Sequence, residues 1–292
     1  MRVTQQMRYD SVGNNLSQLT SRQAAAAQQA QTGLRVNLPS DDPVAASELA
    51  RLSASQSQNT ARRSTITSVR GDAELAESSL QQASDLLVTA KEIAVQGGNG
   101  TLGASERATL ALQIKDIRDQ LIGVSNTKGT VGYLFAGSAT QTKPFETDGT
   151  FNGNDDAHVV DIGNSTPSSV NASGAKAFTV AGGRDVFADL DDLYTALNSN
   201  DTAAITSSLD RLDSSRSQVN NAQANIGLTI NKLDASDSVL SAFDLQSSKR
   251  ADEIASADPA KAYSTLVALN NSLQQSITVS RQILDLAAFK QF

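Results

Sequence analysis

The feature that most constrains this chain is an apolar period of seven residues that recurs in separate stretches. In each stretch apolar side chains return in alternating steps of three and four, which is the pattern of a helix that packs along one seam. The first stretch consists of Ile66, Val69, Ala73, Ala76, Leu80, Ala83, Leu87, Ala90 and Ala94. The second consists of Leu110, Ile114, Ile117, Leu121 and Val124. The pattern predicts long helices that pair along these seams.

A third stretch is too long for a compact small domain. It returns at every seventh residue through Ile205, Leu212, Val219, Ile226, Leu233 and Leu240, with Ile254 two repeats later. At 1.5 Å per residue, one helix over 205–254 would be roughly 75 Å long. Between the first two stretches, Gly97-Gly98-Asn99-Gly100 cannot continue a helix and predicts a helical hairpin. We therefore expect a mainly α fold, an elongated bundle of long helices.

The helical period disappears between residues 129 and 189. Gly, Asn, Asp, Ser and Thr cluster there, and three short runs have the composition of strands: 133–135, 158–162 and 177–180. This segment predicts a small inserted β lobe. Helical spacing resumes near Val186.

Both ends of the chain carry weaker seams. Between Leu19 and Leu34 the first arm has no apolar side chain larger than Ala, which is too little burial to order a long helix alone. We expect coiled-coil arms that are disordered in the monomer and fold against each other and against neighbouring subunits. The predicted interface residues are Tyr9, Val12, Leu16, Leu19, Ala26, Ala30, Leu266, Leu273, Ile277 and Leu284.

Each arm is set off by an Asp-Pro signal. Asp can cap a helix and Pro fits its first turn, so Asp258-Pro259 and the segment at 39–43 mark helix starts. We interpret the latter segment as a hinge, formed by Pro39, Ser40, Asp41, Asp42 and Pro43. The predicted divisions are an N-terminal arm (1–42), a first bundle part (43–128), the β lobe (129–189), a second bundle part (190–257) and a C-terminal arm (258–292).

Composition excludes several classes of protein. The 292 residues contain no Cys, no Trp and one His, which leaves no disulfide framework, Cys nucleophile or paired-histidine metal site. The formal charge of −7 argues against a nucleic-acid partner. No apolar run is long enough to insert in a membrane, and the N-terminal residues lack the apolar core of a cleaved signal. We expect no enzyme activity, no cofactor and no metal.

Four patterns resemble functional motifs, and each of them also has a purely structural interpretation. The G-x-G-x-x-G run at 98–103 follows a helix rather than a strand, which favours a hairpin turn over a dinucleotide site. The acidic run at 148–156 lacks EF-hand spacing and favours turns over calcium binding. His158 has no second histidine to join it at a metal. Asp41 and Asp42 are more simply a cap and a turn than a catalytic pair.

Three motifs resemble a known family. They are Gly132-Tyr-Leu-Phe-Ala-Gly137, Pro144-Phe145 and Gln31-Thr-Gly-Leu-Arg-Val-Asn-Leu-Pro-Ser-Asp-Asp-Pro43-Val-Ala-Ala46. In this order, between helical termini, they resemble the flagellin superfamily of bacterial flagella. Flagellin itself normally continues Asp-Asp-Ala-Ala-Gly, whereas Pro43 follows the second Asp here, as in the members that join hook to filament.

The resemblance implies a structural protein without a catalytic site. Its partners would be the first hook-associated protein, flagellin, the filament cap protein during assembly, other copies of itself in a ring, and a flagellar export chaperone. The implied location is the extracellular flagellum, reached through the flagellar type III export apparatus. The implied chaperone-binding face lies on the C-terminal helix, at Leu273, Ile277, Ile283 and Leu284.

Two alternatives stay open at this point. One is a flagellin-like filament subunit, and the other is a non-flagellar coiled-coil adaptor that binds one partner as a soluble oligomer. A polymerising export substrate predicts protease-sensitive ends in the free monomer, whereas an adaptor predicts protected ones.

Overall fold

The computed structural model describes residues 5–156, 159–163, 168–169 and 172–288. The chain divides into two compact units, which we call the bundle unit (58–242) and the arm unit (1–57 and 243–292). Two long helices contribute to both: α2 (Pro43–Gly97, 55 residues) and α6 (Thr202–Ala255, 54 residues). The mainly α class expected from the heptad stretches is confirmed. Within the described ranges, no helix is both long and apolar enough to cross a membrane.

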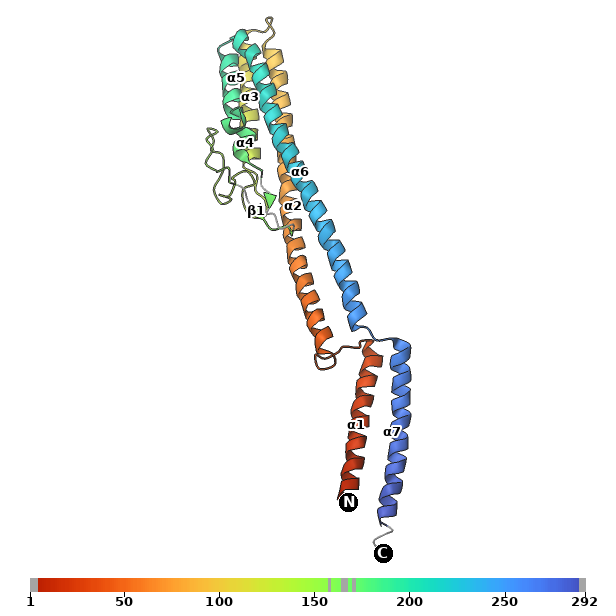
Figure 1. Ribbon diagram of the computed structural model, residues 1–292. Helices are drawn as coiled ribbons and strands as arrows, with labels where there is room; N and C mark the ends of the chain where they lie inside the picture. The colour runs from red at the N-terminus through yellow and green to blue at the C-terminus, as the bar shows by residue number, and fades with distance from the viewer. Residues whose placement is uncertain (1–4, 157–158, 164–167, 170–171, 289–292) are drawn as a thin grey trace. The chain divides into compact units, whose positions relative to one another are not determined.

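In the bundle unit, α2 and α6 lie side by side, with α3 (Ala104–Ser125) and α5 (Val186–Asn198) beside them (Figure 1). One buried cluster joins the four helices, and the predicted heptad positions supply much of it. On α6 every seventh residue is almost completely buried, from Ile205 and Leu212 to Leu233. On α2 the facing positions alternate Leu with Ala, including Leu80, Ala83, Leu87, Ala90 and Ala94.

Polar contacts join the edges of this α2–α6 seam. Lys91 Nζ lies 2.6 Å from a carboxylate oxygen of Asp213, and the Arg63 guanidinium contacts Asp237 at 2.8 Å. Because these pairs lie near the surface, each contributes little stability, but together they favour one register of α2 against α6.

The predicted hairpin turn between α2 and α3 is confirmed. Helix α2 ends at Gly97, where a Cβ would lie 2.4 Å from the Leu197 side chain, so only glycine lets α5 approach this closely. A buried arginine, Arg107 on α3, holds the turn: its Nε donates to Gly97 O and its Nη2 to Asn99 O, both at 2.7 Å. A cation at these carbonyls also suits the negative end of the α2 dipole.

The segment between α3 and α5 contains less strand than expected. Its described strands are β1 (Val159–Val160) and β2 (Ser168–Ser169), an antiparallel pair in which Val159 faces Ser169. Of the run at 133–135, only Tyr133 pairs, in an isolated bridge with Lys128. The strand predicted at 177–180 is wrong, because α4 (Gly174–Phe178) and a 3₁₀ turn, η1 (Val180–Gly182), occupy it.

A cluster of phenylalanine rings explains that correction. Phe178 contacts Phe135 edge-on at a centroid distance of 5.6 Å, and contacts Phe145 in the same way at the same distance. Phe187 completes the cluster against Phe145 at 5.2 Å. The helical turn of α4 points Phe178 into this group, so tertiary packing overrides the strand propensity of the run.

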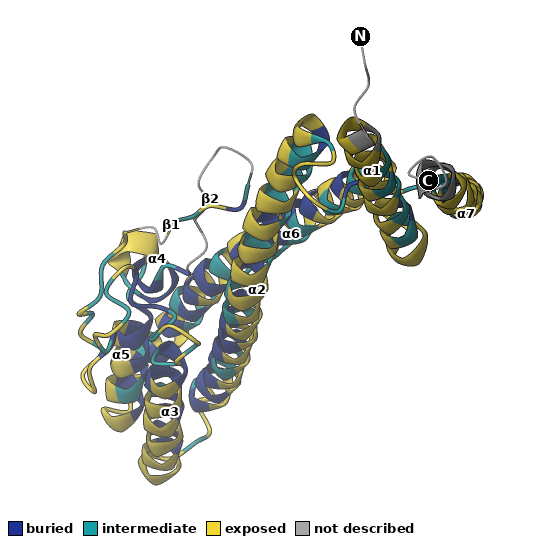
Figure 2. Cartoon of the chain, turned by 90° about the horizontal axis from the view of Figure 1, so that it is seen from below, coloured by how far each residue is buried: buried dark blue, intermediate teal, exposed yellow. Residues whose placement is uncertain are grey.

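The arm unit contains α1 (Gln5–Thr32), α7 (Pro259–Ala288) and the adjoining ends of α2 and α6. Helices α1 and α7 lie side by side (Figure 1). Both are mostly exposed, in contrast to the buried faces of the bundle helices (Figure 2). Gly33, with φ of +70°, follows the end of α1, as expected for a helix C-terminus.

The phenylalanine cluster yields a stability prediction. Phe178→Ala removes a fully buried ring and should lower the free energy of unfolding by about 3–5 kcal/mol. Val180→Ala, at a side chain that is 72% exposed two residues away, should change it by less than about 0.5 kcal/mol. Urea unfolding followed by circular dichroism measures both; equal effects would contradict the packing described here.

Candidate functional site

The candidate functional surfaces are those of the arm unit, since the seams there are the weakest. On α1, Val12, Leu16 and Leu19 are half-buried and Ala26 is buried against α7. Tyr9 and Ala30, predicted on the same seam, are exposed. The α1 half of the intramolecular seam is therefore short, and the side chains at its two ends face solvent.

The predicted seam residues of α7 are likewise partly half-buried and partly exposed. Leu266 and Leu273 are half-buried, and so is Leu269, which the heptad analysis missed. Ile277 is exposed. The side chains of Ile283 and Leu284 lie outside the described residues. Among the predicted interface and chaperone residues of α7 whose side chains are described, Leu266 and Leu273 are partly covered and Ile277, one turn after Leu273, is more exposed.

The outward face of α7 forms an apolar stripe. Tyr263, Val267 and Ile277 are 67%, 42% and 37% exposed, and they recur at heptad spacing. At 100° per residue, Tyr263 and Val267 lie roughly 60–120° around the helix from Leu266 and Leu273, whereas Ile277, one turn after Leu273, lies at the edge of the stripe nearest to them. We call these three residues the α7 stripe. It is a second, unpaired seam on a helix whose first seam is already in contact with α1.

One polar contact interrupts the α1–α7 seam. Gln23 Nε2 donates to Asn270 Oδ1 at 2.7 Å, and both residues are half-buried. A polar pair within an apolar seam costs stability but penalises other registers, in which these amides would lose their partners.

The predicted hinge motif folds into a compact capped turn. Asp41 Oδ2 accepts hydrogen bonds from the backbone N–H groups of Asn37 and Leu38 at 3.0 and 2.8 Å. Asp42 Oδ1 accepts from Ala45 N at 3.0 Å and caps α2, whose first residue is Pro43. The expected cap and turn roles of the two aspartates are confirmed. Pro39 and Ser40, which precede the two aspartates, are exposed.

The segment at 33–35 pairs with the segment at 255–257. Arg35 N donates to Ala255 O at 2.6 Å, and Ala257 N donates to Gly33 O at 2.8 Å. The Arg35 side chain adds contacts in both directions, to Asp42 Oδ2 at 2.9 Å and to Ile254 O at 3.0 Å. We call this pairing the clasp. It joins the two connections that lead to α2 and α7.

Sequence reasoning missed Arg35 as a site residue. Its partner on the other connection, Ile254, lies 219 positions away in the chain, and no periodic pattern marks it. On the other connection, Asp258 Oδ1 accepts from Ala260 N and Lys261 N at 2.9 and 3.1 Å, which confirms the predicted cap of α7.

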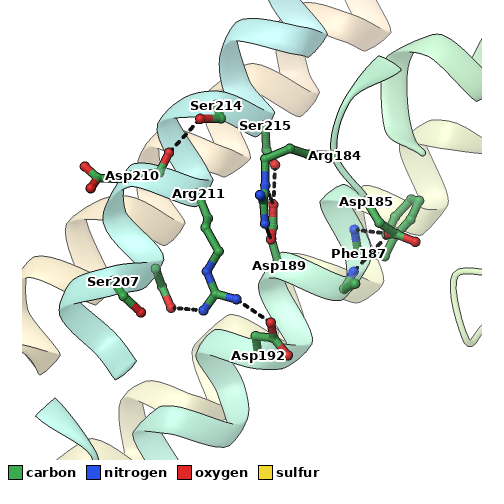
Figure 3. A network of polar contacts seen from close by, with 12 residues as sticks. Arg184, Asp185, Phe187, Asp189, Asp192, Ser207, Asp210, Arg211, Ser214 and Ser215 are labelled. Atoms are coloured by element: carbon green, nitrogen blue, oxygen red, sulfur yellow. Dashed lines mark hydrogen bonds and ion pairs between the residues drawn. The ribbon is translucent and has the colours of Figure 1, made fainter. Parts of the chain in front are cut away.

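The bundle unit contains a buried polar network between α5 and α6 (Figure 3). Asp189 is 2% exposed, and it accepts from Arg184 Nε at 2.7 Å and from Ser215 Oγ at 2.6 Å. The hydrogen bond that Arg184 donates to the Asp189 carboxylate raises the pKa of Arg184 above its ordinary value. Arg211 of α6 contacts Asp192 of α5 in the same network. These charged and hydrogen-bonded side chains hold α5 against α6. The network that Figure 3 draws contains no imidazole that could act as a general base for Ser215, as a serine nucleophile would need.

The remaining sequence candidates have ordinary surroundings. Asp148 Oδ1 accepts from Thr150 N at 2.9 Å, which makes a turn and lowers the pKa of Asp148. The run at 98–103 forms the α2–α3 turn. His158 lies outside the described residues. The described part of the chain holds no group of three or more His, Asp or Glu side chains that could bind a metal.

Comparison with known proteins identifies relatives over the whole chain. Residues 3–140 match the family of the bacterial flagellin N-terminal helical region. Flagellar hook-associated protein 3 of Escherichia coli is 30% identical over 317 residues, covering 99% of each chain. The Salmonella typhimurium protein of the same name is 41% identical over 150 residues, but that match spans less than half of the relative, 46%, and 50% of this chain.

Solved structures agree with the fold. A Vibrio parahaemolyticus protein assigned as a flagellar hook-associated protein is 25% identical, with a TM-score of 0.68 over 74% of this chain and 100% of that one. FlgL of Bacillus cereus shares the fold at 20% identity, with a TM-score of 0.58 over 68% of this chain and 96% of that one.

The clasp yields a pH prediction. Two hydrogen bonds lower the pKa of Asp42 below its ordinary 3.8. The larger effect comes from the Ala45 backbone N–H, and the next from the Arg35 side chain. Ionised Asp42 therefore stabilises the clasp fully above that value and ceases to do so as the pH falls through the lower, folded-state pKa. Asp42→Asn keeps a cap acceptor but loses the charge.

Hydrogen exchange of the backbone amides at 33–45 and 254–258 measures the effect. At about pH 6 the Asp42→Asn variant should exchange faster than the wild type, and the difference should disappear as the pH falls through the lowered pKa of Asp42. Equal protection at the higher pH would contradict a stabilising role for the Arg35–Asp42 pair.

Proposed function

The chain belongs to the flagellar hook-associated protein 3 family and has a structural role in the flagellum, and from that premise we propose that it forms the junction between hook and filament. In this proposal the first hook-associated protein binds on the hook side, flagellin binds on the filament side, and copies of the chain form a ring between them. The ring also nucleates filament growth beneath the filament cap protein. The role is structural and non-catalytic.

The observation that carries the proposal is the exposed apolar surface of the arm unit. Large exposed apolar side chains occur on both arms, on the segments near the clasp and on the adjoining end of α6, and contiguous surfaces of this kind mark protein interaction sites. They are Met7, Tyr9, Leu34, Leu38, Val44, Phe243, Leu245, Tyr263, Val267, Ile277 and Val279.

The weakness of the α1–α7 seam supports the same proposal. Helix α1 has 28 residues, yet its covered apolar side chains among those described are Val12, Leu16, Leu19 and Ala27, which are half-buried, and Ala26, which is buried. Ordering a backbone costs about 1–2 kcal/mol per residue, so a helix with this little burial depends on further contacts. We propose that neighbouring subunits supply them along the α7 stripe, and that the free arms are disordered.

Disordered arms also suit the proposed export route. A chain that passes through the flagellar type III apparatus travels unfolded, and arms without strong intramolecular packing need little unfolding. We propose that an export chaperone covers the C-terminal helix beforehand, at Leu273, Ile277, Ile283 and Leu284.

A filament subunit is the second candidate, because residues 3–140 match the flagellin N-terminal region. A deletion strain separates the two functions. Loss of a junction protein leaves hooks in place while flagellin leaks into the medium, whereas loss of a filament subunit removes the monomer itself. Intact filaments in the deletion strain would contradict both candidates.

The α7 stripe yields a mutational prediction. Ile277→Asp places a charge at the edge of the exposed stripe, one helical turn from Leu273, so it should abolish filament formation when it complements the deletion strain. Gln275→Asp, on the opposite face of α7, adds the same charge at an exposed position and should restore filaments. Leu273→Asp disrupts the α1–α7 seam and should fail as well.

Secretion of the variants separates chaperone binding from assembly. A variant retained in the cell has lost export or chaperone recognition, whereas one that is secreted without filaments has lost a subunit contact. Normal filaments with Ile277→Asp would overturn the assignment of the stripe to either interface.

A further inference from the structure

The α2–α3 turn contains an Asn-Gly pair in an unusual hydrogen-bonding arrangement. Asn99 and Gly100 are exposed, between the end of α2 and the start of α3. Asn99 Oδ1 accepts two hydrogen bonds from Thr101, one from its backbone N at 3.1 Å and one from its hydroxyl at 2.9 Å. Two donors therefore polarise the side-chain carbonyl of an asparagine that precedes glycine.

The nucleophile for an internal reaction lies next to this carbonyl. Within the part of the chain that the structure describes, no acceptor takes the Gly100 N–H. A Cβ built on Gly100 would meet nothing within 4 Å, so the surroundings of Gly100 are open. Asn99 itself is anchored, because its main-chain oxygen accepts from Leu102 N at 3.1 Å and from Arg107 Nη2 at 2.7 Å.

We propose that Asn99 is a site of self-catalysed deamidation. The Gly100 nitrogen loses its proton to solvent and attacks Asn99 Cγ, and the C–N bond of the side-chain amide breaks to release ammonia. Water then opens the resulting five-membered imide at either carbonyl, giving aspartate or isoaspartate at residue 99. The reaction consumes one water and needs no oxidant, reductant or cofactor.

Thr101 is the residue that promotes this reaction. Negative charge develops on Asn99 Oδ1 when the Gly100 nitrogen attacks, and the Thr101 N–H and O–H already point at that oxygen. Donors placed where charge develops lower the barrier, as in an oxyanion hole. Thr101 thus acts as a positioning residue rather than as a nucleophile or a base.

The other Asn-Gly pair of the chain, Asn152-Gly153, is a natural control. Its side-chain amide nitrogen donates to Glu146 Oε1 at 3.0 Å, which sets a carboxylate beside the carbonyl on which negative charge would develop. A Cβ on Gly153 would lie 2.7 Å from the Phe151 ring, so this glycine is packed. The dipeptide is the same, but the surroundings disfavour the attack.

The modification would act on the most buried charge of the turn. Arg107 holds the turn through the carbonyl oxygens of Gly97 and Asn99. An aspartate at residue 99 adds negative charge close to this guanidinium. In an isoaspartate, the side-chain carbonyl carbon of residue 99 forms the peptide bond to Gly100. The main-chain carbonyl that Arg107 contacts is thereby replaced by a free carboxylate, and the contact changes.

Peptide mass spectrometry of the folded full chain, incubated at about neutral pH and 37 °C, tests the proposal. Asn99 should deamidate at least about tenfold faster than Asn152 in the folded chain, and the two rates should converge in urea, where neither environment exists. Comparable rates in the folded chain, or a faster Asn152, would overturn the proposal.

Two variants test the mechanism. Thr101→Val removes the hydroxyl donor at an exposed position and should slow the reaction at Asn99 by up to about tenfold. Gly100→Ala fits the open space but hinders the attacking nitrogen, and it should bring Asn99 down to the rate of the slower pair. An unchanged rate in Thr101→Val would refute the role of Thr101, and an unchanged rate in Gly100→Ala would refute the cyclic route.

Discussion

The packing of α2 against α6 in the bundle unit is the interaction on which the rest of that unit depends. Every seventh side chain of α6 is buried, and α2 presents mostly alanine and leucine to it. Small residues on one helix and larger ones on the other allow close approach without aromatic filling. Helices α3 and α5, the phenylalanine cluster and the α5–α6 polar network are all built against this pair.

The arm unit, in contrast, buries little apolar surface between its two helices. Its two helices share one short seam with a polar pair at Gln23 and Asn270, and they leave a second apolar stripe in water. A flagellar structural protein of this family has neighbours, and the physical account of the arms is complete only with them. The clasp at 33–35 and 255–257 is the exception within this unit, since it is closed by backbone pairing and by Arg35.

Local signals in the sequence predicted the helices and their ends well. The glycines at 97–100, the caps at Asp42 and Asp258, and the heptads of α2 and α6 depend on neighbours within a few residues along the chain. Arg35 at the clasp was missed because its partner Ile254 is distant in the chain, and Arg107 at the turn was missed although its partners Gly97 and Asn99 are nearby, because no periodic pattern marks an arginine that binds backbone carbonyls.

The wrong strand prediction has a tertiary origin. The run at 177–180 has strand propensity, but Phe178 packs into a cluster whose members come from separate segments. The assignment of Ile277 to the arm interface with Leu273 stays a prediction, since Ile277 lies one turn from Leu273 at the exposed edge of the same side of α7. Only the position of α1 decides which face is buried. The predicted five-part division of the chain and the disorder of the free arms remain predictions.

Hydrogen exchange on the free chain and on the assembled junction tests the central claim most directly. The account predicts that amides of α1 and α7 exchange rapidly in the free chain and become protected on assembly. The heptad stretches at 66–94 and 205–240 should be protected in both states. Arms that are as protected in the free chain as residues 205–240, or that gain no protection on assembly, would contradict it.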